Sequence, residues 1–102
     1  MAQITLDLQP QTANKFNTYL KLFGNKELMF DSFIDYHINR LRREVSRMQL
    51  SLDKYEEKYN MGSMEFYQLF EKGKFGDEKD YMLWAGIYEL KTDSEHKLGQ
   101  LA

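Results

Sequence analysis

The sequence predicts a mainly helical fold that begins with one short strand and works as a homodimer. Apolar residues recur at steps of three and four along residues 25–59, a segment that contains neither Pro nor Gly. Such steps place the side chains on one stripe of an α-helix, because a helix completes a turn in 3.6 residues. The stripe consists of Ile34, Ile38, Leu41, Val45, Met48, Leu52, Tyr55 and Tyr59. At 1.5 Å per residue this helix is about 50 Å long. A chain of 102 residues cannot cover it alone, so we expect a partner subunit.

Residues 3–8 alternate in character, with Ile4, Leu6 and Leu8 on one side and polar residues on the other. A period of two is typical of a β-strand, and Pro10 ends the pattern because proline has no amide hydrogen to donate. No second strand is evident in the rest of the sequence. A lone strand leaves its backbone groups unpaired. We therefore expect it to pair with its copy in a second subunit as an antiparallel ribbon.

A short helix is expected between the strand and the long helix. It covers residues 11–23 and ends at Gly24, because glycine adopts the left-handed conformation past a helix end at little cost. Asn25 then opens the long helix, since its side-chain oxygen can accept a hydrogen bond from the first turn.

Two more helices are expected after the long one. Ser63 can cap the first, which stops at Gly73. The second covers residues 78–93, where Asp77 and Asp80 resemble a capping box. The residues beyond it are expected to fray.

Composition limits the chemistry available to the chain. There is no cysteine, and the two histidines, His37 and His96, lie far apart, so a disulfide framework and a thiolate zinc site are excluded. No nucleophile motif, phosphate-binding glycine loop or calcium loop is present, and we expect no enzyme, no cofactor and no metal. Because no apolar run could span a bilayer and no signal peptide is evident, we expect a cytoplasmic protein without membrane contact.

The formal charge of -2 is divided unevenly along the chain. Residues 1–50 hold seven Lys and Arg against five Asp and Glu, whereas residues 51–102 hold seven against eleven. A mildly basic front and an acidic, aromatic back suggest two partners of different character. Four arginines crowd the middle of the long helix, and of two explanations, a solvated face that pairs with the acidic tail and a nucleic-acid patch, we favour the solvated face. They are Arg40, Arg42, Arg43 and Arg47.

The order of strand, proline, short helix, Gly-Asn turn and amphipathic helix is written as QITLDLQPQTANKFNTYLKLFGNKELMFDSFIDYHINRLRREV. It resembles the ribbon-helix-helix (Arc/MetJ-like) family of dimeric DNA-binding proteins. The resemblance implies that residues 1–48 dimerise and bind DNA, with outward side chains of the paired strands reading bases in the major groove. These side chains are Gln3, Thr5 and Asp7. The resemblance also implies a phosphate contact at the start of the second helix, at Asn25 and Lys26.

The segment KYEEKYNMGSMEFYQLFEKGKFGDEKDYMLWAGIYEL looks like the C-terminal part of small antitoxin-like partners of short toxins. This resemblance implies that residues 49–102 form a helical extension that binds a partner protein through aromatic anchors. The anchors are Phe66, Phe70, Tyr81, Trp84 and Tyr88. The alternative is that the same aromatic residues form a core that covers the end of the long helix.

Two functions remain open. The first is a dimeric transcriptional regulator, the antitoxin of a toxin-antitoxin pair, which binds operator DNA, represses its own operon and masks a small toxin protein with its C-terminal helices. The alternative is a homodimeric protein-interaction module that does not bind DNA. This alternative fits the strand, which carries the carboxylate of Asp7 and neither Lys nor Arg. A negative charge there is tolerated if no DNA phosphate comes near it.

Overall fold

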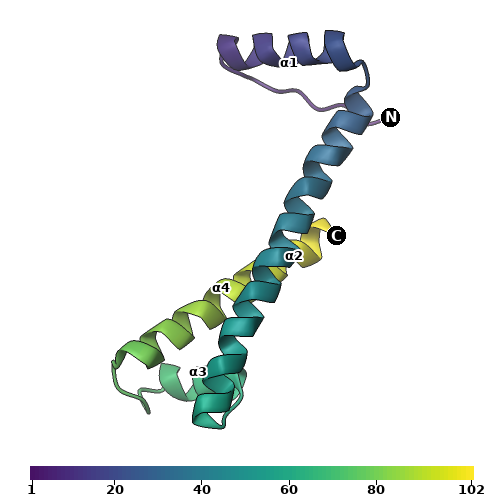
Figure 1. Cartoon of the computed structure of the whole chain (residues 1–102). Helices are drawn as coiled ribbons and strands as arrows, with labels where there is room; N and C mark the ends of the chain where they lie inside the picture. Colours follow the sequence, from purple (N-terminus) through teal and green to yellow (C-terminus); the bar gives the residue numbers. More distant parts are fainter. The chain divides into compact units, whose positions relative to one another are not determined.

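Four α-helices and their connections make up the computed structural model, which describes all 102 residues (Figure 1). The helices are α1 (Pro10–Phe23), α2 (Lys26–Tyr59), α3 (Ser63–Glu71) and α4 (Lys79–Leu101). The chain divides into two compact units, which we name the N-terminal unit (Met1–Ile34) and the C-terminal unit (Asp35–Ala102). The boundary lies within α2, and each unit is described by itself. The prediction of a mainly helical chain is confirmed.

The predicted N-terminal strand is wrong, and with it the ribbon-helix-helix-like fold. Residues 1–9 form no strand and none occurs elsewhere in the chain, whereas a ribbon-helix-helix protein needs a strand for its ribbon. The alternation has another cause, because Ile4, Leu6 and Leu8 line an apolar hollow beside α1 and the start of α2. An extended segment whose alternate side chains face such a hollow shows the same period of two as a strand, without ladder hydrogen bonds.

The ends of α1 and the start of α2 are determined by residues that lie at these positions. Pro10 occupies the first turn of α1, where its fixed φ suits the helix and its missing N–H would have no partner. Gly24 has φ 78° and donates its N–H to the carbonyl of Leu20 at 2.8 Å, which ends α1. The amide of Leu28 donates to Asn25 Oδ1 at 3.0 Å. The predicted Asn25 cap is therefore confirmed.

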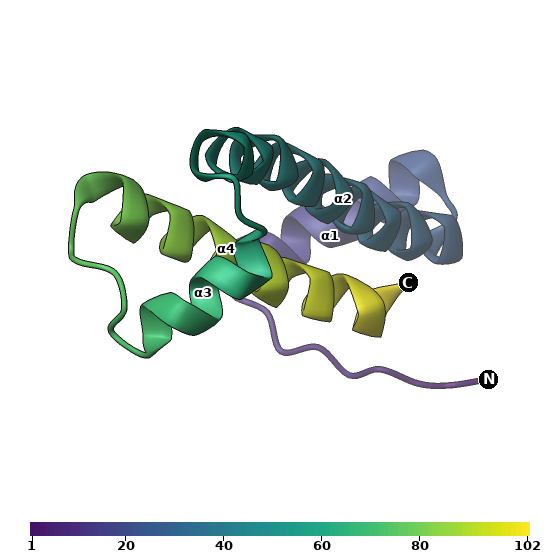
Figure 2. The ribbon, with the colours of Figure 1, turned by 90° about the horizontal axis from the view of Figure 1, so that it is seen from below.

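The core of the chain lies in the C-terminal unit, where α3 and α4 lie on one side of the second half of α2 (Figure 2). Its fully buried apolar residues are Leu52, Phe66, Trp84 and Ala85. The rings of Phe66 and Trp84 stack with centroids 3.8 Å apart and planes 2° apart. From α2, Tyr55 and Tyr59 stack on the same indole at 5.7 and 5.5 Å. The one tryptophan thus joins all three helices.

The start of α3 is fixed by a carboxylate of α2 and not by the predicted Ser63 cap. Glu56 Oε2 accepts hydrogen bonds from the backbone N–H of Ser63 at 3.0 Å and from its hydroxyl at 2.6 Å. The Ser63 Oγ in turn accepts the indole N–H of Trp84 at 2.9 Å. This chain of hydrogen bonds satisfies the polar atoms that the core buries, because a buried donor without a partner is costly.

The last helix also differs from its prediction. It begins at Lys79 and continues to Leu101, well past the expected end at residue 93. Ion pairs one turn apart, Lys91 to Glu95 and Asp93 to Lys97, each at 3.0 Å, support the added turns. No side chain caps the start of α4, and Asp80, expected in a capping box, binds residues of α2 instead. None of the four helices has the length and apolar character needed to cross a bilayer.

Ser63→Ala is expected to lower the free energy of unfolding of the C-terminal unit by about 1–3 kcal/mol, because it leaves the buried Trp84 N–H without an acceptor. The measurement is urea unfolding followed by the fluorescence of Trp84, the one tryptophan of the chain. The control is Glu57→Ala, an exposed position on α2, which is expected to change stability by less than about 0.5 kcal/mol. Equal effects of the two substitutions would contradict the role assigned to the hydrogen-bond chain.

Candidate protein interaction site

The N-terminal unit has no core of its own. Not one of its 34 residues is buried, and only four are even half-buried. The half-buried residues are Ala13, Phe16, Leu20 and Met29. Because Phe16 of α1 and Phe30 of α2 have ring centroids 5.8 Å apart, the two helices do touch. The contact is too small to remove either helix from water.

Besides Met1, ten large apolar side chains of this unit stand exposed, and we name them the apolar surface. They are Ile4, Leu6, Leu8, Tyr19, Leu22, Phe23, Leu28, Phe30, Phe33 and Ile34, between 39% and 85% exposed. Four of them are aromatic, and at about 200 Å² per aromatic side chain they alone leave roughly 400 Å² in water. That is about half of the ~800 Å² that each partner buries in an ordinary protein interface. Large apolar side chains gathered in water mark candidate interaction sites, so the N-terminal unit is the candidate here.

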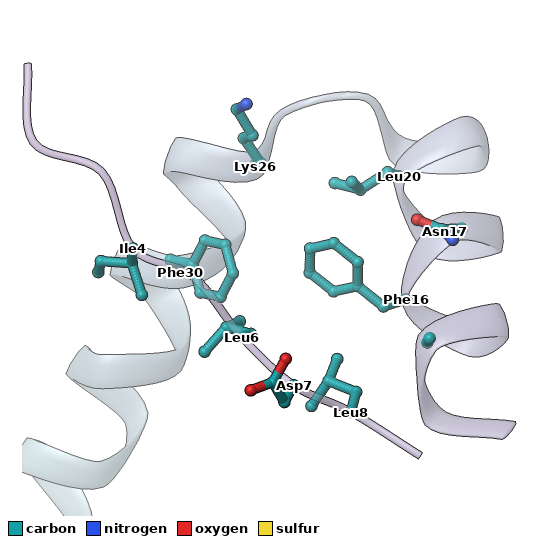
Figure 3. Close-up of a pocket in the computed structure, with 10 residues that line it drawn as sticks. Ile4, Leu6, Asp7, Leu8, Phe16, Asn17, Leu20, Lys26 and Phe30 are labelled. Carbon is teal, nitrogen blue, oxygen red and sulfur yellow. The ribbon is translucent and has the colours of Figure 1, made fainter. Parts of the chain in front are cut away.

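A hollow of about 730 Å³ lies within the apolar surface (Figure 3). Its lining comes from the extended N-terminal segment, from α1 and from the first turns of α2. The apolar part consists of Ile4, Leu6, Leu8, Ala13, Phe16, Leu20 and Phe30. Three polar side chains complete it, those of Asp7, Asn17 and Lys26. Since most of this lining is apolar, the hollow is suited to receive apolar side chains.

The residues expected to bind DNA are spread over the N-terminal unit. Gln3 and Thr5 are exposed on the extended segment, outside the lining of the hollow. Asp7 and Lys26 both line the hollow, and Asn25 uses its side-chain oxygen as the cap of α2. The structure thus brings Asp7 and Lys26 to one place. A role of any of the five in binding DNA stays a prediction.

The five residues expected to bind a partner protein all lie in the core of the C-terminal unit or against it. Phe66 and Trp84 have no exposed surface, and Phe70, Tyr81 and Tyr88 are half-buried against them. The alternative, in which these aromatic residues cover the end of α2, accounts for this placement. Their role as anchors for a partner stays a prediction.

Charged groups tie α2 to α4 at the edge of the aromatic core. Asp80 Oδ2 accepts hydrogen bonds from Lys58 Nζ and from the Tyr59 hydroxyl, each at 2.6 Å. The hydrogen bond from Lys58, followed by that from Tyr59, lowers the pKa of Asp80 below its usual value, and the bond to Asp80 raises the pKa of Lys58. In α3, the Tyr67 hydroxyl donates to Glu89 of α4, which together with Glu71 raises the pKa of Tyr67.

Sequence reasoning missed the apolar surface as a site, although a signal was present. The segment 19–23 places Tyr19, Leu20, Leu22 and Phe23 within five residues. Four apolar residues in so short a run cannot all share one stripe of a helix, since a single stripe takes about three per two turns. Some of them must therefore face away from α2, toward water or a partner.

The chain matches no protein-family model, and no curated protein or solved structure matches it either.

Asp80→Asn is expected to lower the urea midpoint of the C-terminal unit at pH 6, because it removes the charge that Lys58 pairs with. The pKa of Asp80 is lowered by folding, so its stabilising effect is complete above its usual value of 3.8 and is lost as the pH falls through the lower, folded-state value. The difference in midpoint between wild type and variant should therefore shrink between pH 6 and pH 2.5. Circular dichroism at both pH values checks this.

Asp77→Asn is the matched control, because Asp77 is an exposed carboxylate next to α4 with neither hydrogen bond nor ion pair. It is expected to change the midpoint little at either pH. If the difference in urea midpoint between wild type and Asp80→Asn stays constant with pH, the electrostatic explanation is contradicted.

Proposed function

We propose that this chain is a homodimeric protein-interaction module, in which two N-terminal units cover each other's apolar surface. One observation carries the proposal: a unit of 34 residues with two helices buries no residue while ten large apolar side chains stand exposed. Burial of apolar surface is the main force that holds helices in place. Without a partner, the N-terminal unit lacks that force.

Charge favours a second copy of the chain as the occupant of the apolar surface. The N-terminal unit carries three lysines and three carboxylates, so two copies meet without net repulsion. These groups are Lys15, Lys21, Lys26, Asp7, Glu27 and Asp31. A strongly charged partner of either sign would gain nothing from this balance. A twofold interface places the same patch on both subunits, which suits a surface that is apolar and neutral.

The C-terminal unit has a different part in this proposal. It owns a complete aromatic core, so it does not need the dimer to bury its apolar side chains. Dimerisation through the N-terminal unit then presents two C-terminal units on one particle. Two linked binding surfaces raise the apparent affinity for a partner with repeated sites, because the second contact becomes intramolecular.

The antitoxin and operator-binding roles stay predictions and are not the function proposed here. Operator binding depended on a paired ribbon whose outward residues read bases, whereas toxin masking depended on the aromatic C-terminal segment. The dimer proposal requires neither a small toxin protein nor operator DNA as a partner.

Leu22→Glu combined with Leu28→Glu is expected to convert a dimer, with twice the 12.2 kDa of one chain, into a monomer. The two leucines are 71% and 62% exposed, so the substitutions leave the folded chain intact and place charges only on the apolar surface. Sedimentation velocity of the full chain between about 1 and 100 μM gives the mass. The double variant should raise the dissociation constant of the dimer at least 100-fold, which corresponds to about 2.7 kcal/mol.

Leu50→Glu combined with Leu90→Glu is the matched control. These leucines are 63% and 62% exposed but belong to the C-terminal unit, so the dimer should persist. A wild-type chain that is monomeric at every concentration would overturn the proposal. So would a control variant that dissociates as readily as the test variant.

A further inference from the structure

The outer face of α2 carries a line of cations that the proposed dimer does not use. Its members follow one another at steps of three, four, seven and four residues, which keeps them on one side of the helix. They are Arg40, Arg43, Arg47, Lys54 and Lys58, and we name them the cationic ridge. From its first to its last member the ridge extends about 27 Å at 1.5 Å per residue. All five lie in the C-terminal unit.

Charge on this part of α2 is separated by face. Residues 35–59 hold six cations and five carboxylates, and five of the six cations stand on the ridge. The nearest carboxylates, Glu44 and Glu57, lie beside the ridge on opposite flanks. The other three carboxylates, Asp35, Asp53 and Glu56, lie on other sides of the helix. The ridge is therefore positive although the whole chain is negative.

Three members of the ridge have no anionic partner. Arg40 pairs with Glu44 at 3.2 Å and Lys58 with Asp80 at 2.6 Å. Arg43, Arg47 and Lys54 are exposed and make no ion pair with any carboxylate of the chain. The expected pairing of the arginines with the acidic tail does not occur, since the tail's carboxylates pair with lysines. Three unpaired cations on one straight line suit a ligand with regularly repeated negative charge.

We propose that the cationic ridge binds the phosphate backbone of a nucleic-acid duplex. Ridge positions three or four residues apart lie about 5–6 Å from each other, and Arg47 and Lys54, seven residues apart, lie about 10 Å from each other. A duplex strand offers one phosphate per ~3.4 Å of its axis, so each ridge cation has a phosphate within reach. Between Arg47 and Lys54 the same side of α2 holds only Leu50 and Ser51. The ridge thus holds no Asn or Gln for the bidentate contact that reads adenine, and we assign its cations to phosphate contacts, which carry no sequence information.

This inference does not rest on the dimer, because each chain carries its own complete ridge. It also differs from the operator binding expected from the sequence, which placed the contacts on Gln3, Thr5 and Asp7. The mass of the particle tests the dimer, and the salt dependence of nucleic-acid binding tests the ridge. Either proposal can therefore fail without the other.

The experiment is a fluorescence anisotropy titration of the full chain against a 20-base-pair duplex of mixed sequence between about 20 and 200 mM NaCl. Three unpaired cations give a slope of log affinity against log salt concentration of about -2.7 per chain. The affinity for the duplex should therefore fall about 500-fold over this range. Arg43→Gln with Arg47→Gln should leave about one third of the wild-type slope. A scrambled duplex should bind equally well. Duplex DNA and duplex RNA of the same length distinguish the two sources of phosphate, and the tighter one is the ligand.

Lys72→Gln with Lys74→Gln is the matched control. It changes the net charge by the same amount at two exposed lysines of the connection between α3 and α4, away from the ridge. The control variant should keep the wild-type slope. The proposal is overturned if the wild type binds neither duplex at 20 mM salt, if the two double variants lose the same share of the slope, or if polyglutamate displaces the duplex at equal charge. Trp84 fluorescence verifies that every variant keeps its core.

Discussion

The packing of the C-terminal unit depends on the contacts that Trp84 makes. Its ring stacks on Phe66 of α3 and on two tyrosines of α2, and its N–H reaches Glu56 through the hydroxyl of Ser63. An indole is large enough to contact three helices at once, but burying it also buries a hydrogen-bond donor. The serine and the glutamate remove that cost, and in doing so they set where α3 begins relative to α2. One side chain thus determines both the packing and the register of the C-terminal unit.

The N-terminal unit lacks any comparable residue. Its largest side chains stand on α1 and at the start of α2, where the contact between Phe16 and Phe30 leaves them in water. Burial is therefore concentrated in one unit, although the apolar residues are distributed over both. Since the two units are joined within α2, this difference cannot be explained by a linker that merely tethers an unrelated segment. The proposed dimer would supply to the N-terminal unit the burial that the C-terminal unit finds within itself.

Much of the helical structure could be predicted from the sequence, because helix ends depend on nearby residues. Pro10, Gly24 and Asn25 act within a few positions of where they stand, and their effects are confirmed. The strand could not be excluded in the same way, because a period of two reports only that one side of a segment is apolar. Contacts between distant residues were equally out of reach, as with Glu56 and Ser63. For the candidate site, sequence showed which residues are apolar but not that the N-terminal unit fails to bury them.

Two faces of α2 give the helix its functional character. One face is apolar and supplies Leu52 to the core, and another carries the cations of the ridge. Most carboxylates of the helix lie off the ridge, which is why the ridge stays positive in an acidic protein. Solubility alone does not explain why cations and carboxylates stand on different faces of the helix. Mixed charges keep a helix equally soluble and add favourable ion pairs between neighbouring turns. Placing cations together costs mutual repulsion, and a polyanion bound along the ridge would offset that cost.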